Sequence, residues 1–518
     1  MRLFLLLFLI IIDLASSHNI LVYINAIGKS HLDFCDSLIN SLTDRGHVVD
    51  YIIARMNDKV AGNGKNNASR VYTFGFKGGS DWKKTAHLID PFKDSNFDFG
   101  GFRQYSNVGN NLCEIALDDT GLHEFIKFRK YQIGLVSTFD YCGIGLFVNA
   151  GVPSIATFNA VPILSQQAIL AGLPSPASNI VPLFHRANLR TFSGRFWNLA
   201  NWAYINYVQI PEIREQQQKI FAKRYGENYD IDSVAARVDL SFINSNEVME
   251  KPRPISHRIQ YIGGINLRSP KPIDKNLDKL LSISKKGTII FSFGTQVGGE
   301  VYPRYAVKNF VKVFKKYSDY TFLWKYDVQE SEVEMFKNAK NVYPLDWLPQ
   351  TDLLYDPRVI GFISHVGLNS FNEASYAGVP IVAIPLFADQ PHNAENGLLR
   401  GTTYILDKTK LSEQSIEAGI KAILEDPKYL ENALRLRKML IEKPGQPKDR
   451  FVNWVEYAAE NPGLHKIFEL PGSRMGIIEY YCVDALVFTA IVVILVIYLV
   501  FKIFKNLFVA KTKKDKTS

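Results

Sequence analysis

Short, unbroken runs of apolar residues recur along this chain, and stretches with the spacing of an amphipathic helix separate them. Residues 20–24 predict a buried strand, residues 32–45 a helix, and residues 48–53 a second strand. Gly46 lies between the helix and the second strand, where a glycine commonly ends a helix. The chain therefore opens with a β-α-β unit, the building block of a parallel sheet.

The same alternation continues beyond this unit. Residues 133–136 predict a strand, and residues 139–150 predict the helix that follows it. In the second half, residues 288–292, 359–363 and 381–384 are apolar runs of the length of buried strands. No repeat of fixed period is present in the sequence. We therefore expect an α/β fold with two parallel-sheet domains.

Prolines and glycines between residues 252 and 272 mark the boundary between the two halves. A chain of 518 residues is too long for one ordinary core, and two domains of about 200 residues are expected. The predicted organisation is a signal peptide (1–17), an N-terminal domain (18–250), a linker (251–285), a C-terminal domain (286–465), a juxtamembrane segment (466–484), a transmembrane helix (485–501) and a tail (502–518).

Both ends of the chain resemble membrane-targeting segments. Arg2 precedes an apolar run over residues 3–12, and small residues at 15–17 suit cleavage of a secretory signal peptide. An uncleaved anchor is the alternative. Residues 485–501 carry no charge and would reach roughly 25 Å as a helix, enough for one membrane span. The lysines beyond them predict a cytosolic tail.

The formal net charge of +9 is concentrated in this tail, which leaves about +4 on the rest of the chain. A nucleic-acid-binding protein would need a basic stripe on a folded face, and the sequence shows none. The four cysteines lack metal-ligand spacing, and a disulfide is allowed without its pairing being specified. Asn67-Ala68-Ser69 is a sequon for N-glycosylation.

Aromatic residues gather between residues 189 and 223, in a stretch that we expect to be helical. Two interpretations are open. The aromatic side chains either face an acceptor or a membrane, or they belong to the ordinary core of the N-terminal domain, which is the more common role of such spacing.

Polar residues follow the strands predicted between residues 347 and 401. His365 and Gly367 come after the strand at 359–363, and Asn369 or Ser370 can cap the next helix. Asp389-Gln390 follows the strand at 381–384. In doubly wound sheets, ligands bind at the carboxyl ends of the strands, with phosphate at a helix N-terminus. The pattern predicts a phosphorylated, hydroxyl-rich ligand.

The strings WLPQ (347–350), HVGLN (365–369) and FADQP (387–391) closely resemble the signature of the UDP-glycosyltransferase family, and specifically its animal, membrane-bound UDP-glucuronosyltransferase branch. The resemblance continues more loosely through the first half. It implies two Rossmann-like domains facing a cleft, the GT-B architecture. It also implies a UDP-sugar co-substrate, no cofactor and no metal.

The same resemblance assigns donor-binding roles. Trp347 would stack on uracil, Gln350 would contact the nucleoside, and Glu373 would accept both ribose hydroxyls. A core tryptophan and a solvated glutamate are the alternatives. The pyrophosphate contacts would come from His365, Asn369 and Ser370, and the sugar contacts from Asp389 and Gln390. Ser292 and Gly294-Thr295 would add a second turn at the cleft, where the glycine permits close approach. Gly367 allows the tight turn after the strand at 359–363. The family usually has glycine where this chain has Val366, whose side chain is expected to point away.

The resemblance also matches His31, after the first strand, with the catalytic histidine of the family. A neutral imidazole there can take the proton of an acceptor hydroxyl. The family's orienting acid normally follows the strand at 133–136, where this chain has Ser137. Serine cannot stabilise an imidazolium as a carboxylate does. Asp140, about one helical turn further, is the tentative substitute.

The implied function is inverting transfer of glucuronate or glucose from a UDP-sugar to a hydroxyl or similar nucleophile on a small lipophilic acceptor, as in detoxification. A non-catalytic relative that binds nucleotide-sugar or lipophile is the alternative, supported by Ser137. The expected location is the endoplasmic reticulum membrane, type I, with both domains lumenal. Lys514 and Lys516 resemble its lysine retrieval signal, although a generic basic tail would look the same. A homo-oligomer is compatible with the family.

Overall fold

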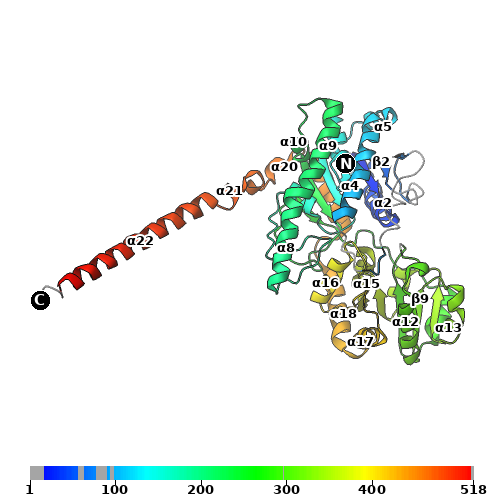
Figure 1. Cartoon of the computed structure of the whole chain (residues 1–518). Helices are drawn as coiled ribbons and strands as arrows, with labels where there is room; N and C mark the ends of the chain where they lie inside the picture. The colour runs from blue at the N-terminus through cyan, green and yellow to red at the C-terminus, as the bar shows by residue number, and fades with distance from the viewer. Residues whose placement is uncertain (1–16, 57–63, 77–89, 94–98, 296, 515–518) are drawn as a thin grey trace, which may run out of the picture. The chain divides into compact units, whose positions relative to one another are not determined.

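The computed structural model describes residues 17–56, 64–76, 90–93, 99–295 and 297–514. The chain divides into two compact units, Met1–Phe468 and Glu469–Ser518. The first unit contains two parallel sheets with helices between their strands (Figure 1). Of the predicted signal peptide, all but Ser17 lies outside the described residues.

The first sheet has seven strands in the order β3-β2-β1-β4-β5-β6-β7. Successive side chains of β1 enter opposite cores: Ile20 and Val22 pack on one face, and Leu21 and Tyr23 on the other. Burial on both faces explains why the strand is a continuous apolar run. The strands are β1 (Asn19–Ala26), β2 (Val48–Arg55), β3 (Arg70–Gly75), β4 (Ile133–Ser137), β5 (Ser154–Asn159), β6 (Val238–Ile243) and β7 (Ile259–Tyr261).

The helices of this half begin and end close to the predicted residues, with two differences near the expected catalytic residues. The first helix starts at Lys29, so that His31 lies in its first turn, and the predicted helix 139–150 starts only at Cys142. The helices are α2 (Lys29–Asp44), α4 (Phe99–Asp118), α5 (Thr120–Lys127), α6 (Cys142–Asn149), α7 (Ser165–Leu170), α8 (Phe192–Tyr204), the π-helix η2 (Ile205–Gln209), α9 (Ile210–Tyr225) and α10 (Ile231–Ala235).

The second sheet has six strands in the order β10-β9-β8-β11-β12-β13. They are β8 (Gly287–Ser292), β9 (Tyr320–Lys325), β10 (Val342–Leu345), β11 (Val359–Ser364), β12 (Ile381–Ala383) and β13 (Thr403–Ile405). Its helices are η3 (Gly299–Val301), α12 (Arg304–Lys316), η4 (Glu330–Glu332), α13 (Val333–Lys337), α14 (Gln350–Leu354), α15 (Leu368–Ala377), α16 (Gln390–Leu399), α17 (Glu413–Glu425) and α18 (Pro427–Glu442).

The stretch predicted as a linker, residues 251–285, is more ordered than a linker. It contains β7, the edge strand of the first sheet, and α11 (Lys275–Ile283). In addition, α19 (Pro447–Glu460), predicted within the C-terminal domain, packs on the first sheet. Phe451 of α19 is fully buried there, with its ring centroid 4.8 Å from that of Phe242. Residues from the end of the first unit thus complete a core that the start of the chain begins.

The stretch 189–223 is helical as expected, and Phe221 of α9 is core, but the aromatic residues of α8 are not buried. On α8 the single buried residue is Asn198, whereas Phe192, Phe196 and Trp197 are exposed. The interpretation of these aromatic residues as core is therefore wrong for α8.

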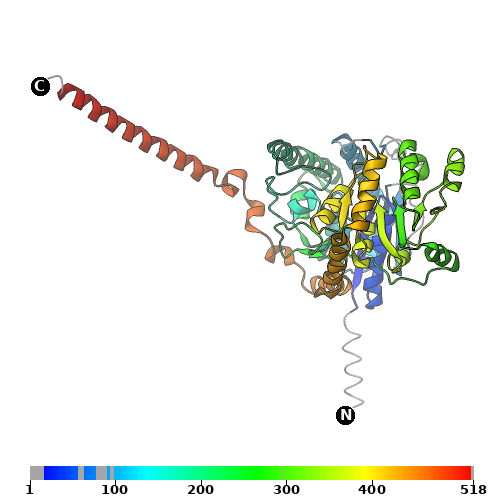
Figure 2. The same ribbon diagram turned by 90° about the horizontal axis from the view of Figure 1, so that it is seen from below.

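The second unit contains η5 (Pro471–Arg474), α21 (Ile477–Tyr480) and α22 (Val483–Lys514). Figures 1 and 2 show α22 as one long, continuous helix. Residues Val483–Asn506 are long and apolar enough to cross a membrane, with a mean hydropathy of 2.9. This segment includes the span 485–501 expected from the sequence and extends it at both ends. This helix is therefore a candidate membrane span.

Candidate active site

The carboxyl ends of β8 to β12 carry the predicted donor-binding residues. Because the strands are parallel neighbours, their ends meet at one edge of the sheet. The predicted residues are Ser292, which ends β8, with Gly294 and Thr295 after it; Trp347 and Gln350 after β10; His365, Gly367, Asn369, Ser370 and Glu373 after β11; and Asp389 and Gln390 after β12. The second sheet therefore brings these residues together from segments distant in the sequence.

Trp347 presents its ring to the outside of the protein. The residue is 64% exposed, so the alternative of a core tryptophan is wrong. The ammonium of Lys325 lies 5.4 Å from the centre of the ring. An exposed indole next to a cation can stack on a nucleobase while a charge stands beside it.

Lys325 is a site residue that the sequence analysis missed. It is the last residue of β9, which lies between β8 and β10, and its Nζ donates to the carbonyl oxygen of Gly294. Burial lowers its pKa. The sequence contained a signal for Lys325, because this lysine ends a strand whose two neighbours in the sheet carry other predicted donor-binding residues. A cationic group at this place can neutralise phosphate charge.

Glu373 is held by side chains of α14 and is not a solvated helix-face residue. Its carboxylate accepts a hydrogen bond from Thr351 Oγ1 at 2.9 Å and another from Gln350 Nε2. The same Gln350 amide donates to Ser370 Oγ at 3.1 Å. Burial raises the pKa of Glu373, and these hydrogen bonds oppose that shift. The network fixes an acceptor carboxylate at the edge of the second sheet, a suitable partner for two vicinal hydroxyls.

His365 sits between two glycines that leave space for its ring. A Cβ at Gly294 would lie 2.9 Å from Cε1 of His365, and a Cβ at Gly367 would lie 2.8 Å from Nε2. Burial and the nearby charge of Lys325 lower the pKa of His365 to about 4. The imidazole is therefore neutral near pH 7, and it can donate a hydrogen bond while Lys325 supplies the charge.

The helix α15 begins without a side-chain cap. Its N-cap is Gly367, so the prediction that Asn369 or Ser370 caps it is wrong. Both lie inside the first turn, where Asn369 Oδ1 accepts a hydrogen bond from Asn266 Nδ2 at 3.0 Å. The backbone N–H of Leu368 is directed to Asp389, and no N-cap side chain occupies the other N–H groups of this turn, which can therefore bind an anion.

Two non-glycine residues beside the site have left-handed backbones. Val366 has a φ of 53° and Ala388 a φ of 55°. A β-branched residue rarely adopts this conformation, and such strain clusters at functional sites. Asn393 Nδ2 connects the two turns by donating to the Val366 carbonyl at 3.0 Å and to Asp389 Oδ2 at 2.6 Å. This chain thus has valine in a backbone conformation that favours the glycine usual in the family.

Asp389 and Gln390 differ in which side-chain atoms are left for hydrogen bonds to a sugar. Asp389 is buried, which raises its pKa, and one of its oxygens bonds Asn393. Gln390 uses its side-chain oxygen to accept from the backbone N–H groups of Leu386 and Phe387, at 2.8 and 3.0 Å. Its amide nitrogen is thus the atom that a ligand hydroxyl could meet.

On the first sheet, His31 lies next to the loop that follows β4. The strands β1 and β4 pair directly, and the ring centroid of His31 is 5.5 Å from that of Phe139. Burial lowers the pKa of His31 to about 4. Within the described residues its imidazole makes no hydrogen bond. His31 thus presents a neutral imidazole near pH 7, and the residue remains partly exposed to solvent.

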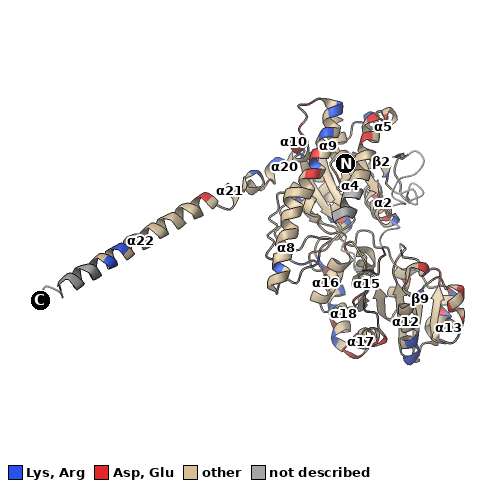
Figure 3. Cartoon of the chain, in the orientation of Figure 1, with Lys and Arg blue, Asp and Glu red and all other residues tan. Residues whose placement is uncertain are grey.

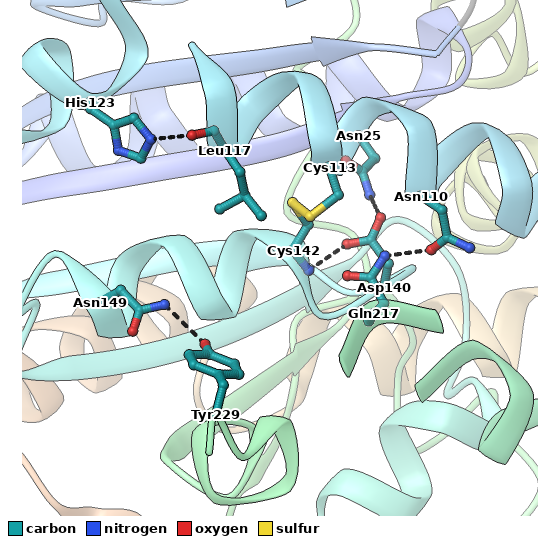
Figure 4. Close-up of a disulfide and its surroundings, with 10 residues drawn as sticks. All are labelled: Asn25, Asn110, Cys113, Leu117, His123, Asp140, Cys142, Asn149, Gln217 and Tyr229. Carbon is teal, nitrogen blue, oxygen red and sulfur yellow. Dashed lines mark hydrogen bonds between the residues drawn. A yellow bond between two sulfur atoms is a disulfide. The ribbon is translucent and has the colours of Figure 1, made fainter. Parts of the chain in front are cut away.

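Ser137 and Asp140 bond to β1 and to α6 rather than to His31. Ser137 Oγ accepts from the backbone N–H of Asn25 at 2.9 Å. Asp140 accepts from Asn25 Nδ2 at 3.0 Å and from the Cys142 N–H at 2.9 Å (Figure 4). Burial raises the pKa of Asp140 to about 6. Asn25, which the sequence analysis did not single out, is thus the residue that joins this loop to β1.

A disulfide also fixes the loop between β4 and α6, at the residue where α6 begins. Cys113 of α4 and Cys142, the first residue of α6, are bonded (Figure 4). The sequence had left this pairing open. Cys35 is buried with a free thiol, and Cys482 is exposed. In the described residues no group of three or more His, Cys, Asp or Glu side chains could hold a metal. Asn67, the predicted glycosylation site, is exposed.

Known proteins with similar sequences are animal UDP-glucuronosyltransferases. The ugt-48 protein of Caenorhabditis elegans is 28% identical, with 98% of each chain covered. UDP-glucuronosyltransferase 2B1 of Rattus norvegicus is 26% identical over 77% of this chain and 75% of its own length. UDP-glucuronosyltransferase 1A9 of Mus musculus is 25% identical over 91% and 89%, respectively.

Solved structures of glycosyltransferases share the fold. The crystal structure of the glycotransferase of kitacinnamycin superposes with a TM-score of 0.59 at 16% identity, covering 85% of this chain and 99% of its own. That of UDP-glucose: anthocyanidin 3-O-glucosyltransferase in complex with UDP gives 0.56 at 13% identity, covering 86% and 99%. These likenesses confirm the expected GT-B architecture of two Rossmann-like domains.

The family model described as UDP-glucoronosyl and UDP-glucosyl transferase matches residues 20–517. Its match covers both sheets, the residues at the strand ends and the C-terminal apolar helix. The donor of such enzymes is a UDP-sugar, and they need no cofactor. This chain therefore belongs to the UDP-glucuronosyl and UDP-glucosyl transferase family.

Proposed function

We propose that this enzyme transfers glucuronate or glucose from its UDP-sugar to a hydroxyl or similar nucleophile on a small lipophilic acceptor, with inversion at the anomeric carbon. The observation that carries the proposal is the division of chemistry between the two sheets. Groups suited to uracil, ribose, phosphate and sugar gather after β8 to β12, whereas a neutral histidine stands after β1.

The donor half supports binding without a metal ion. Trp347 offers a face for uracil, and Glu373 offers acceptors for the ribose hydroxyls. Lys325, neutral His365 and the uncapped start of α15 supply positive potential where a pyrophosphate would lie. These groups would stabilise the charge that develops on UDP as the bond to the sugar breaks.

The acceptor half supports base catalysis. His31 takes the proton from the acceptor O–H while the oxygen forms a bond to the anomeric carbon. The bond from that carbon to the phosphate oxygen breaks, and UDP leaves with the electron pair. Attack opposite the leaving group inverts the anomeric centre. The Asp140 carboxylate, held by Asn25, follows Ser137 by three residues and would stabilise the imidazolium after a rearrangement of its loop.

The proposed location is the endoplasmic reticulum membrane in type I orientation, with the first unit in the lumen. A cleaved signal at 1–17 would begin translocation, α22 would stop it, and the lysines after the span would remain in the cytosol. The free Cys482 and the disulfide Cys113–Cys142 are compatible with this arrangement.

The test is turnover of UDP-glucuronate and of UDP-glucose with a simple phenol, followed by NMR of the product. We expect release of UDP with formation of the β-anomer from the α-linked donor. His31→Ala should reduce turnover by about 10²–10⁴-fold and leave the affinity for UDP, measured by calorimetry, unchanged. Binding of UDP without turnover of either donor over a panel of phenols would favour the non-catalytic alternative.

A further inference from the structure

One buried carboxylate contacts the helix that carries the predicted sugar-binding residues. The helix α16 begins at Gln390, and Asp389 is its N-cap residue. One oxygen of Glu250 pairs with Nε2 of His392 and also accepts a hydrogen bond from Asn396 Nδ2 at 3.1 Å. Because His392 and Asn396 are four residues apart, they lie on the same side of α16 in successive turns. Glu250 thus contacts the first turn of the helix and the turn that follows it.

This carboxylate comes from the other sheet. Glu250 lies between β6 and β7 of the first sheet, whereas α16 follows β12 of the second. The second oxygen of Glu250 accepts from Ser245 Oγ at 2.7 Å, and its backbone carbonyl accepts from the guanidinium of Arg400 at 2.8 Å. Arg400 is the residue at which α16 ends. The segment after β6 therefore contacts α16 from its first turn to its end, and it connects the first sheet with the predicted sugar end of the donor site.

Glu250 carries its charge inside the protein. Figure 3 shows the strands of both sheets largely tan, with acidic and basic residues concentrated on the surrounding helices and loops. Glu250 is only 6% exposed. Burial alone would raise its pKa, but the charge of His392 and hydrogen bonds from His392, Ser245 and Asn396 lower it to about 2. Glu250 is therefore ionised near pH 7, and a buried charge of this kind is costly unless its partners keep their places.

His392 also acts on Asp389, three residues before it in the chain. Burial raises the pKa of Asp389, whereas a hydrogen bond from Asn393 and the charge of His392 oppose that shift. An ionised carboxylate accepts hydrogen bonds and donates none, which suits the hydroxyls of a sugar. By pairing with His392, Glu250 keeps the charge of the imidazole at a defined place beside Asp389.

We propose that Glu250 and His392 are positioning residues for the sugar of the donor. Glu250 holds the start of α16 against the segment after β6, so that Asp389 and Gln390 keep the geometry in which they bond the sugar hydroxyls. Neither Glu250 nor His392 belongs to the groups assigned to uracil, ribose or phosphate. The inference rests on the proposed sugar-binding role of Asp389 and Gln390, and it adds the residues that orient this pair.

A matched control lies on the same helix. Lys251, the neighbour of Glu250, pairs with Glu395 of α16, and both of these side chains are 38% exposed. An ion pair at that exposure contributes little to stability. Glu395→Gln therefore removes a contact between the same segment and the same helix without disturbing the buried pair. Glu250→Gln and His392→Gln remove the buried charges at nearly constant volume.

Titration calorimetry on the full chain, without acceptor, compares the affinity for UDP with that for the UDP-sugar that supports turnover. The ratio of the two affinities reports the contacts to the sugar. We expect Glu250→Gln and His392→Gln to weaken binding of the UDP-sugar, to leave UDP binding unchanged and to lower kcat/KM with a phenol by roughly 10- to 100-fold. The double variant should be no worse than either single one, because the two residues act as one pair. Glu395→Gln should change none of these values.

Two results would overturn the proposal. If Glu250→Gln and His392→Gln weaken the binding of UDP and of UDP-sugar equally, the pair only maintains the fold of the second half. If both affinities and kcat/KM stay unchanged, the start of α16 keeps its geometry without the pair.

Asp389→Asn separates this inference from the proposed function beneath it. Weaker binding of UDP-sugar in Asp389→Asn, but not in His392→Gln or Glu250→Gln, would keep the sugar site and remove the positioning role. Unchanged binding and turnover in Asp389→Asn would remove the sugar site itself, and the inference would fail with it.

Discussion

The pKa of His31 sets the pH range in which it can act as a base. Burial lowers this pKa to about 4, so the neutral, basic form predominates above pH 4 and is lost as the pH falls through that value. We expect kcat/KM to be level from about pH 5 to 8 if His31 acts alone. The pH dependence of kcat/KM with a phenol acceptor measures this.

Asp140 would add a second feature to the same profile. Its pKa is raised to about 6 by burial, so an ionised Asp140 is available only above that pH. If the charge of Asp140 stabilises the imidazolium of His31, the activity should decrease as the pH falls through about 6. Asp140→Asn should lower the activity at pH 7 and remove this decrease. An acid limb that persists near pH 6 in Asp140→Asn would show that His31 itself titrates there.

Donor affinity should depend on Glu373 and Lys325. We expect Glu373→Ala to weaken UDP binding by about 1.5–3 kcal/mol, since a carboxylate that bonds hydroxyls is lost. Lys325→Gln should weaken it by a similar amount, whereas Lys316→Gln, at an exposed pair with Glu417, is the control. Titration calorimetry with UDP gives both values. Unchanged affinity in Lys325→Gln would place its ammonium outside the phosphate site.

Among the elements, α4 and α6 depend on the disulfide between them. The bond closes a loop with a sequence separation of 29 residues. Replacing both Cys113 and Cys142 by alanine should therefore cost about 2–4 kcal/mol in the free energy of unfolding. Cys482→Ser is the control for loss of a cysteine. Urea unfolding of the oxidised proteins makes the comparison, and equal midpoints for all three would contradict it.

The same bond has a consequence for catalysis. Cys142 donates its backbone N–H to Asp140, so the disulfide also fixes the loop that faces His31. A disulfide-free variant that remains folded should lose turnover without losing affinity for UDP, because the donor residues lie on the other sheet.

For the whole molecule, topology decides how the substrates arrive. If the first unit is lumenal, protease applied to sealed microsomes should remove only the tail after α22, and Asn67→Gln should remove a glycan-dependent shift in electrophoretic mobility. Donor must then enter through a transporter, while lipophilic acceptors can come from the bilayer. Digestion of the first unit without detergent would reverse the orientation.

The two sheets are not independent pieces. The helix α19 belongs to the second half by sequence, yet Phe451 and Val455 are fully buried against the first sheet. Phe92, from the first half, packs on Phe293 and Tyr302 beside the donor loop. A fragment limited to residues 286–465 would expose the apolar side of α19. UDP binding is therefore best measured on the full chain.

Much of the fold could be predicted from the sequence, because strands and helices are encoded by neighbours. Runs such as 20–24 and 359–363 are apolar over the length of a buried strand, and they became β1 and β11. A phosphate-binding edge could be predicted as well, because polar residues directly after such strands share one edge of a parallel sheet. The individual donor-binding roles came from the resemblance to the family, and they stay predictions. The long apolar segment at the C-terminus needed no tertiary information either.

Only the tertiary structure decided which groups meet across the chain. It paired Cys113 with Cys142, joined Asp140 to Asn25 and placed Lys325 beside Trp347. It also turned the aromatic residues of α8 outward and gave Val366 a left-handed backbone. The physical reason is that periodicity is a local property of the sequence, whereas these arrangements depend on tertiary packing. Periodicity shows that a helix has an apolar face, but what covers that face depends on elements far away in the sequence.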